Sequence, residues 1–488
     1  MDAENQLIAQ RLEKLKWLVE KGVNPYPYRF EKKNNATEIL DSFKKLKKEE
    51  RTKKKVSIAG RIMSFRLMGR ASFIHVQDET GRIQAYVRED KIGKESYDIF
   101  RKLDIGDIIG IEGLVFRTKM GEITVEAGSV ELLCKSLRPL PEKWHGLTDI
   151  EARYRERYVD LIANPGVKDV FVKRFKIVNS IREFLNKQGY IEVDTPVLQP
   201  VYGGASARPF KTFLHDIKMD VYLRISNELY LKRLIVGGFE KVYEISRDFR
   251  NESIDRTHNP EFSMIEYYQA YADFNDMMRL TEDMVLNALK SVQKGTMVNY
   301  HGNVIDFKTP WTRMTMKEAI KKYAKIDVDK LGHNELVKLK EEHKLDIENN
   351  ASRDEFIQAI FEEFVEPNLV NPVFITEHPK ETTPLCKESR KDRQLIERFE
   401  IFAGGFELAN GYSELNDPLK QKELLEEQAK KLRGGDEGAN PYDSDFIKAL
   451  EYGMPPTGGV GVGIDRLAML LLGQESIKDV ILFPFMKS

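Results

Sequence analysis

Residues 241–268 read KVYEISRDFRNESIDRTHNPEFSMIEYY, and this stretch indicates the fold most directly. A polar loop separates two groups of apolar strand-forming residues, which are Val242, Tyr243 and Ile245 before the loop and Phe262, Met264 and Ile265 after it. This pattern predicts two strands joined by a loop, which is a β-hairpin.

The faces of this predicted hairpin carry groups that suit a nucleotide. Because a strand places every second side chain on the same face, Arg250 and Glu252 should share one face, and so should Phe262, Glu266 and Tyr268. A guanidinium offers paired hydrogen bonds to phosphate oxygens, and a phenyl ring offers a stacking surface for a flat base. An exposed hairpin held by salt bridges is the alternative.

A second segment, ERFEIFAGGFELANGYSELNDP at 397–418, has the same alternation, with Asn410, Tyr412 and Glu414 on one strand face. Glu400 and Glu407 are an odd number of residues apart, which would place them on opposite faces of a regular strand.

Gly404 and Gly405 lie between these two glutamates and are expected to form a bulge that brings both to one side. Two converging carboxylates beside a triphosphate are suitable ligands for Mg²⁺, which prefers oxygen donors. Paired with lysines instead, Glu400 and Glu407 would be structural.

A third segment, GMPPTGGVGVGIDRLAMLLLG at 453–473, predicts a glycine-rich strand followed by a helix. Gly459, Gly461 and Gly463 do not have the spacing of a dinucleotide-binding motif, and no P-loop lysine follows them. Such glycines let a ligand or a neighbouring backbone come close. Arg466 at the helix start is a candidate for a terminal phosphate, with a surface ion pair as the alternative.

Upstream, five short β-rich pieces between Val56 and Leu133 predict a small barrel of the OB-fold type, a common platform for single-stranded nucleic acid. Phe73, His75 and Gln77 share one face of its second piece and could stack on and bond to bases. The alternative is that Phe73 fills the barrel.

Four parts are expected along the chain: a helical N-terminal extension at 1–55, the barrel at 56–137, a proline-stiffened linker at 138–150 and a second domain at 151–488. The extension ends in a basic run, Lys44–Lys55, that favours a solvated helix surface, with phosphate contact as the alternative.

Composition limits the function classes. The chain has 488 residues, of which 41% are hydrophobic and 32% charged, within the globular range. A formal net charge of -1 gives no global attraction to nucleic acid, so any such binding must use a local surface. Cys134 and Cys386 are the only cysteines, which indicates neither a disulfide framework nor a zinc site. No apolar run suits a membrane span or a secretory signal, so a cytoplasmic location is expected.

Taken together, the segments resemble the three signature motifs of class II aminoacyl-tRNA synthetases in chain order. FVKRFKIVNSIREFLNKQGYIEVDTPVL at 171–198 looks like the first motif, whose helix and strand form a dimer interface. FRNE with HNPEF resembles the second motif, and GVGIDRL resembles the third, with Arg466 as its arginine. The resemblance implies an α+β fold, with an OB-fold barrel before a catalytic antiparallel sheet that is flanked by helices and carries a helical insertion.

The barrel points to the subgroup for lysine, aspartate and asparagine, and the details look like its lysine-specific members. Three stretches carry this resemblance: RISNELYLKRLIVGGFEKVYEISRDFRNE, HNPEFSMIEYYQAYAD and ELANGYSELNDP. A serine replaces the more usual glycine after FRNE.

The resemblance also implies roles for individual residues. Catalytic roles fall to Arg250 and Arg466. ATP contacts fall to Arg250, Glu252, His258, Asn259, Phe262, Glu400, Glu407 and Arg466, with Glu400 and Glu407 as Mg²⁺ ligands. Lysine contacts fall to Gly204, Glu228, Arg250, Glu266, Tyr268, Asn410, Tyr412 and Glu414. Anticodon contacts fall to Phe73, His75 and Gln77.

The implied reaction is activation of L-lysine by ATP and transfer of the lysyl group to tRNA(Lys) by a homodimer. An ammonium leaving water must be paired, and Glu266 with Glu414 would supply the partner. Asparagine or aspartate would leave both carboxylates unpaired, at a cost of about 3 to 5 kcal/mol. An asparagine or aspartate enzyme of the same subgroup, or a noncatalytic RNA-binding or signalling relative, stays as the alternative.

Overall fold

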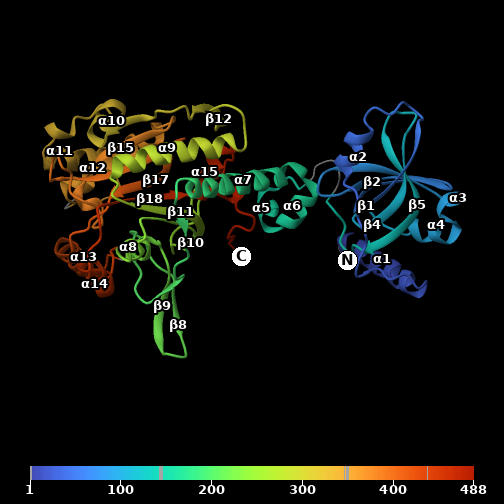
Figure 1. Cartoon of the computed structure of the whole chain (residues 1–488), viewed down its shortest axis with the longest axis horizontal. Helices are drawn as coiled ribbons and strands as arrows, with labels where there is room; N and C mark the ends of the chain where they lie inside the picture. The colour runs from blue at the N-terminus through green and yellow to red at the C-terminus, as the bar shows by residue number, and fades with distance from the viewer. Residues whose placement is uncertain (1–2, 142–146, 346, 348–350, 437, 488) are drawn as a thin grey trace. The chain divides into compact units, whose positions relative to one another are not determined.

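The computed structural model divides into two compact units, Met1–Thr148 and Asp149–Ser488 (Figure 1). The structure describes residues 3–141, 147–345, 347, 351–436 and 438–487. Part of the expected linker, at 142–146, lies outside the described residues.

The first unit is built on a closed barrel with the strand order β1-β2-β3-β5-β4. The strands are β1 (Arg51–Met68), β2 (Ala71–Gln77), β3 (Arg82–Arg88), β4 (Ile108–Arg117) and β5 (Ile123–Cys134). The helices are α1 (Ala3–Glu20), α2 (Ala36–Phe43), α3 (Glu89–Ile92) and α4 (Lys94–Phe100). Ile74 and Val76 of β2 point into the barrel core, and Leu18 of α1 joins the same core. The predicted barrel and N-terminal helix are therefore both present.

The first strand begins earlier than predicted. β1 starts at Arg51, five residues before Val56, and so includes the end of the basic run Lys44–Lys55. Arg51 pairs with Phe116 of β4, and its guanidinium lies 4.8 Å from the centre of that ring. The helix-surface prediction is wrong for the whole run, because α2 ends at Phe43, residues 44–50 form turns and irregular structure, and residues 51–55 belong to a strand that pairs with β4.

The second unit contains an eight-stranded sheet with the order β14-β15-β16-β17-β18-β11-β10-β6. Its pairs are antiparallel except β14 with β15 and β10 with β6. The strands are β14 (Thr312–Thr315), β15 (Val373–Pro379), β16 (Leu395–Ala403), β17 (Phe406–Ser413), β18 (Thr457–Gly463), β11 (Glu261–Ala270), β10 (Lys241–Phe249) and β6 (Ile191–Glu192). The predicted hairpin is β10 and β11.

Helices cover one face of this sheet, and α8 (Glu228–Val236) packs over β10 and β11 on the other face. The helices α7 (Pro165–Lys187), α9 (Phe274–Lys290) and α15 (Ile464–Leu471) contribute to one large hydrophobic core with β11, β16, β17 and β18. Figure 1 shows α7 and α9 lying alongside each other, and the two helices pack together. The apolar side chains of these helices face this core.

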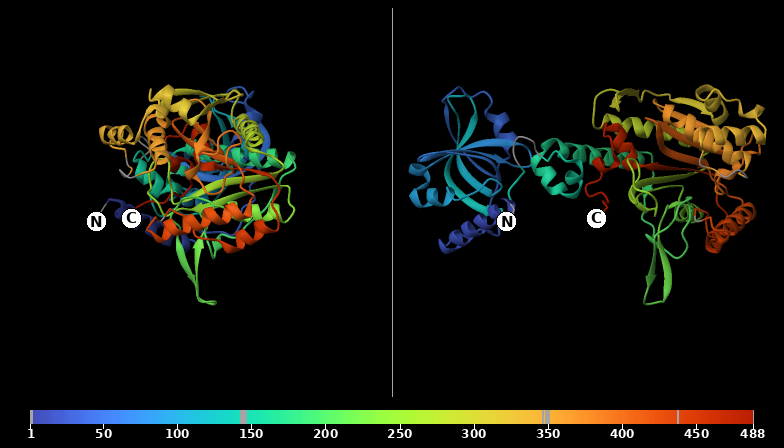
Figure 2. Two further views of the ribbon diagram at one scale, coloured as in Figure 1. Left: turned by 90° about the vertical axis from the view of Figure 1, so that its left-hand side faces the viewer. Right: turned by 180° about the vertical axis from the view of Figure 1, so that it is seen from behind.

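The remaining elements surround the sheet (Figure 2). The short helices are α5 (Ile150–Arg155), α6 (Arg157–Ala163), α8 (Glu228–Val236), α13 (Pro418–Arg433), α14 (Ser444–Glu451) and α16 (Ile477–Val480). The expected helical insertion is α10 (Met316–Tyr323), α11 (His333–His343) and α12 (Arg353–Phe364), with the turns η1 (Val328–Lys330), η2 (Glu366–Asn368) and η3 (Lys380–Thr382). Smaller sheets comprise β7 (Leu198–Gln199), β8 (Lys211–Leu214) and β9 (Met219–Leu223), and β12 (Met297–Tyr300) with β13 (Asn303–Asp306).

The alternation of strands decides which side chains face away from the helices. On β11, Ile265 and Tyr267 enter the helical core, so Phe262, Glu266 and Tyr268 lie on the opposite face. Polar side chains of β11 and β17, with glycines of β18 between them, thus line the middle of this face.

Among the described residues, no helix is both long and apolar enough to cross a membrane.

Candidate active site

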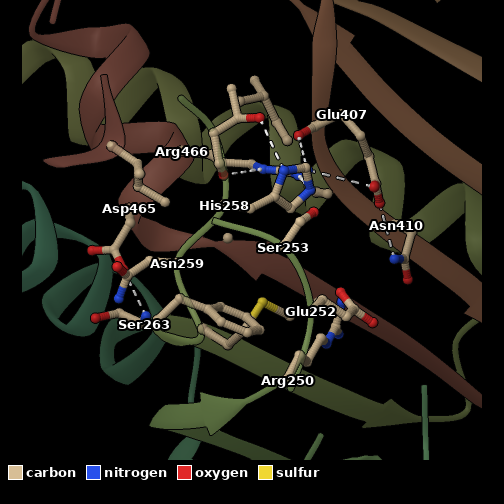
Figure 3. Close-up of a pocket in the computed structure, with 18 residues that line it drawn as sticks. Arg250, Glu252, Ser253, His258, Asn259, Ser263, Glu407, Asn410, Asp465 and Arg466 are labelled. Carbon is tan, nitrogen blue, oxygen red and sulfur yellow. Dashed lines mark hydrogen bonds and ion pairs between the residues drawn. The ribbon is translucent and has the colours of Figure 1, made fainter. Parts of the chain in front are cut away.

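Two adjoining cavities lie over the face of the large sheet opposite α7, α9 and α15. The first has a volume of about 210 Å³ and the second about 390 Å³. Both are lined by Arg250, Met264, Glu407, Asn410 and Gly461. A ligand could therefore extend from one into the other, and Figure 3 shows the first of them.

Arg250 stands where the two cavities meet. β10 ends at Phe249, so Arg250 and Glu252 lie in the loop, whereas the sequence pattern predicts them on the strand. The loop begins tightly, because Arg250 N donates to Pro260 O at 3.0 Å. The Arg250 guanidinium lies 5.1 Å from the centre of the Phe262 ring, and its Nε is buried without a hydrogen-bond partner in the described chain. A cation with a free donor beside an aromatic ring suits an anionic group attached to a flat base.

Arg466 is held at the other side of the first cavity (Figure 3). It lies at the start of α15, where Nη1 donates to Glu407 O at 3.1 Å and Nη2 lies 2.7 Å from His258 Nε2. Because a guanidinium only donates, His258 accepts at Nε2 and donates from Nδ1 to Asp255 Oδ2 at 2.8 Å. The chain Asp255, His258 and Arg466 holds a second guanidinium in the cavity.

Glu252 and Asn259 also line the first cavity, as predicted for the nucleotide site. The amide of Asn259 is already engaged, since Nδ2 donates to Glu261 O at 2.6 Å and Oδ1 accepts from Phe485 N at 3.2 Å. Asn259 therefore holds the loop and the C-terminal segment in place.

Glu400 and Glu407 do come to the same side of the sheet, but not by the predicted bulge. Gly404 and Gly405 form the turn between β16 and β17, with φ of +66° and +83°. The register shift of this hairpin instead leaves Leu408 as the extra residue. A bulge is present, and it lies on β17 because the glycines are needed for the turn.

Glu400 is buried beside Arg398 and lines neither cavity, whereas Glu407 lines both. Burial raises the pKa of Glu400 to about 7, Arg398 opposes this shift through an ion pair, and the charge of Glu407 adds to it. No group of three or more metal-binding side chains occurs in the described part of the chain. Two carboxylates alone suit Mg²⁺, which completes its coordination with phosphate oxygens and water.

The second cavity gathers the residues that the resemblance assigned to the amino acid. They are Gly204, Glu228, Arg250, Glu266, Tyr268, Asn410, Tyr412 and Glu414. Gly204 has φ of +89°, and a Cβ there would lie 2.8 Å from Ser226 Oγ. A glycine is therefore required at that wall of the cavity.

Glu266 is buried at the floor of this cavity. Oε1 accepts from Ser226 Oγ at 2.7 Å and from Asn227 N at 3.2 Å, and Oε2 accepts from Tyr268 OH at 3.1 Å. Burial raises the pKa of Glu266 to about 8, and the negative charges of Asp248 and Glu228 add to the shift. A cation in the cavity would stabilise the ionised carboxylate.

The sequence reasoning missed Lys232, which is 0% exposed. Its Nζ lies 2.6 Å from Glu228 Oε1 and 2.5 Å from Glu414 Oε2. The prediction that Glu414 stands unpaired is wrong, because α8 brings this lysine beside it. Glu228 and Lys232 are four residues apart on one helix, and that spacing was the available signal.

A buried ion pair behind the first cavity was missed as well. Arg174 Nη2 of α7 donates to Asp465 Oδ1 at 2.6 Å and to Ser263 Oγ at 2.9 Å, while Asp465 Oδ2 accepts from Ser263 N at 2.7 Å. These bonds fix the start of α15 against β11 and so position Arg466.

The barrel presents Phe73, His75 and Gln77 on its outer face. The Phe73 ring stacks on Tyr86 at 4.4 Å between centres, so the alternative that Phe73 fills the barrel is wrong. His75 Nε2 lies 2.9 Å from Glu122 Oε1, and Gln77 Oε1 accepts from Arg82 Nε at 2.6 Å. The face combines a stacking surface with hydrogen-bonding groups.

Comparison with known proteins agrees with this geometry. Residues 149–487 match the family described as tRNA synthetases class II (D, K and N), and residues 56–133 match the OB-fold nucleic acid binding domain. The fold and the site define an aminoacyl-tRNA ligase, and the chain belongs to the class II tRNA synthetases of the aspartate, lysine and asparagine group.

Its curated relatives within this group include lysine--tRNA ligases. That of Pelotomaculum thermopropionicum is 53% identical over 99% of this chain and 95% of its own length. That of Carboxydothermus hydrogenoformans is 51% identical over 99% of this chain and 98% of its own length. That of Methanoculleus marisnigri is 49% identical over 98% of this chain and 94% of its own length.

The raised pKa of Glu266 predicts a stability change on neutralisation. Between its ordinary pKa and about 8, the folded chain binds more protons at this group than the unfolded chain, so stability falls as the pH rises through this window. We expect Glu266→Gln to melt at a higher temperature than the unaltered protein at pH near 8, and the difference to narrow toward pH near 5.

Calorimetric melting at several pH values measures this difference. Glu261→Gln, at the exposed first position of β11, is the control and should show no such trend. A Glu266→Gln variant that melts lower at every pH would contradict the burial argument.

Proposed function

We propose that the chain is a lysine--tRNA ligase, which activates L-lysine with ATP to lysyl-adenylate and pyrophosphate and then transfers lysine to the 3′ end of tRNA(Lys). The observation that carries the proposal is the acidic second cavity, where Glu228, Glu266 and Glu414 adjoin a cavity holding two arginines. The names of the curated relatives support the same substrate.

The first cavity takes ATP. Phe262 stacks on the adenine, and Arg250 binds the α-phosphate and the substrate carboxylate at the junction of the cavities. Arg466 and His258 bind the far end of the triphosphate, and Glu252 helps to hold the nucleotide. Positioning and charge stabilisation account for this chemistry, so no covalent protein intermediate is required.

Glu400 and Glu407 are the residues that would hold Mg²⁺, and the bound ion supplies positive charge to the phosphate oxygens. Arg398 keeps Glu400 in place through their ion pair. Asn410 Nδ2 donates to Glu407 Oε1 at 3.1 Å and orients the second carboxylate.

The second cavity takes lysine. Gly204, Glu228 and Asn410 surround the α-groups, whereas Glu266, Tyr268 and Glu414 surround the ε-ammonium, with Tyr412 in the wall. A desolvated ammonium requires paired carboxylates, and removing one partner of a buried pair costs on the order of 3 to 5 kcal/mol. Asparagine and aspartate lack the second ammonium and leave these carboxylates unpaired.

The outer face of the barrel takes the anticodon loop. Unstacked bases lie on Phe73 and bond to His75 and Gln77, as single-stranded RNA is commonly bound. We accordingly divide the chain into a helical extension (1–55), an anticodon-binding barrel (56–137), a linker (138–150) and a catalytic domain (151–488), in a protein of the cytoplasm, where tRNA is charged for translation.

We further propose a homodimer formed through the first motif. Large apolar side chains are exposed on α7 and on the short strands after it, among them Val172, Phe175, Ile191, Leu198 and Phe213. Exposed apolar side chains of this kind are available to pack in an interface between subunits.

Exchange of labelled pyrophosphate into ATP, run with each of the twenty amino acids, tests the proposed activity. We expect lysine to stimulate exchange and the other amino acids to leave it near background, because only lysine brings an ammonium to the end of the second cavity. Stimulation by asparagine or aspartate and not by lysine would overturn the specificity, and no stimulation by any amino acid would overturn the activity.

Arg250→Ala should lower the rate of exchange by roughly a hundredfold or more, since it removes a preorganised donor from the phosphate. Arg247→Ala is the matched control, because Arg247 lies three residues earlier and is exposed on β10. Steady-state exchange rates of the two variants measure the effect. Equal rates for Arg250→Ala and Arg247→Ala would exclude Arg250 from the chemistry.

A further inference from the structure

A buried positive charge lies behind the lining of the second cavity, in contact with two of its carboxylates. Lys232 is buried on α8 and contacts carboxylates from two separate elements, Glu228 on the same helix and Glu414 just after β17. Burial lowers the pKa of Lys232, but the charges of Glu228 and Glu414 outweigh burial and raise it, so the ammonium stays charged. No resemblance or comparison assigns this residue a role.

The contacts of Lys232 take up only part of the acidic group. Glu414 Oε1 is buried and has no hydrogen-bond partner among the described residues, and Glu266 accepts only from the neutral donors Ser226, Asn227 and Tyr268. The cavity is therefore still acidic after Lys232 is counted.

The charges of one group within the lining can be counted. The three carboxylates that the proposed function places around the substrate, Glu228, Glu266 and Glu414, carry three negative charges when ionised. Lys232, behind the lining, carries one positive charge, so this group keeps two negative charges. Lysine has two ammonium groups, and its carboxylate pairs with Arg250 under the proposed function.

Two other charged groups nearby have ion-pair partners in the described chain. Asp248 lies 3.3 Å from Arg224 Nε, and Arg398 pairs with Glu400. The lining also holds Glu355, Glu381, Glu407, Asp436 and Lys431, and among the described residues none of these forms an ion pair with the three carboxylates.

We propose that Lys232 is a specificity-determining residue: it neutralises one carboxylate permanently and leaves two, which matches an amino acid with two ammonium groups. The inference rests on the proposed function, because it takes lysine as the substrate. Lys232 also holds Glu228 and Glu414 on opposite sides of one ammonium, which fixes their separation without help from the substrate.

Comparison with a cavity that has no internal lysine, or two of them, shows what the charge of Lys232 does. Without Lys232, three buried carboxylates would face two ammonium groups, and a buried carboxylate left unpaired takes up a proton. A second internal lysine would leave one charge and favour a substrate with one ammonium. One internal lysine is the number that suits lysine itself.

Lys232→Met tests the proposal, because methionine keeps most of the volume and removes the charge. The variant should raise the KM for lysine about tenfold or more near pH 7 and leave the KM for ATP within about twofold, since one pKa unit is a tenfold change. The KM for lysine should fall as the pH rises, because the carboxylates must ionise to bind the substrate. The midpoint of this fall should lie at a higher pH in Lys232→Met, because removing the ammonium raises the pKa of these carboxylates.

The titratable and charged groups around Lys232 determine this pH profile. They are Glu228 on α8, Tyr268 and Glu266 on β11, Tyr412 and Glu414 on and after β17, Cys386 beside Glu414, and Arg398 on β16. All are present in each variant, so only the lysine charge differs.

Pyrophosphate exchange from about pH 6 to about pH 9 measures both KM values. Lys232→Arg keeps the positive charge. The pH midpoint of its KM for lysine should therefore equal that of the unaltered protein, even if the larger side chain raises the KM itself. Lys241→Met, at the start of β10 and outside both cavities, is the matched control and should change neither value.

The outcomes separate the inference from the proposed function. Lysine-dependent exchange by the unaltered protein establishes the function whatever the variants do. An unchanged KM for lysine in Lys232→Met would contradict the inference. A raised KM whose pH midpoint does not move would also contradict it, because packing alone would then explain the role of Lys232. Loss of cooperative melting in Lys232→Met would assign the ion pairs to folding and would equally overturn it.

Discussion

The burial of several carboxylates beneath one face of a β-sheet is the constraint on which the rest of this structure depends. Glu414 lies 2.5 Å from a buried lysine, and its Oε1 has no hydrogen-bond partner among the described residues. Glu266 accepts hydrogen bonds only from neutral donors. A folded chain keeps such a cluster only when the surrounding structure holds it in place and a ligand or proton compensates it. The cluster is therefore best explained by the cation that it binds.

The packing of the sheet leaves space on one face for this cluster. The strands turn their apolar side chains toward α7, α9 and α15, so the other face is left for polar groups. Glycines on β18 make room on that face, since a Cβ at Gly459 would lie 2.1 Å from Glu414 Oε1. The buried pair of Arg174 and Asp465 then fixes the start of α15, where Arg466 lines the first cavity.

Much of this arrangement could be predicted from the sequence, because period-two patterns report which residues share a strand face. The hairpin of β10 and β11, the barrel and the cavity residues followed from that pattern and from the family motifs. The bulge was misplaced, since spacing alone cannot say whether Gly404 and Gly405 turn the chain or bend a strand. Lys232 was missed because its partner Glu414 is distant in sequence, and only the fold brings α8 beside the end of β17.

The central claim is that an ammonium substrate compensates carboxylates that hold protons in the free protein. Calorimetric titration of lysine near pH 7.5, repeated in buffers of different ionisation enthalpy, tests it directly. Burial raises the pKa of Glu266 to about 8, so we expect lysine binding to release protons and the measured enthalpy to vary with the buffer. An enthalpy that is the same in every buffer, with lysine bound, would contradict the account.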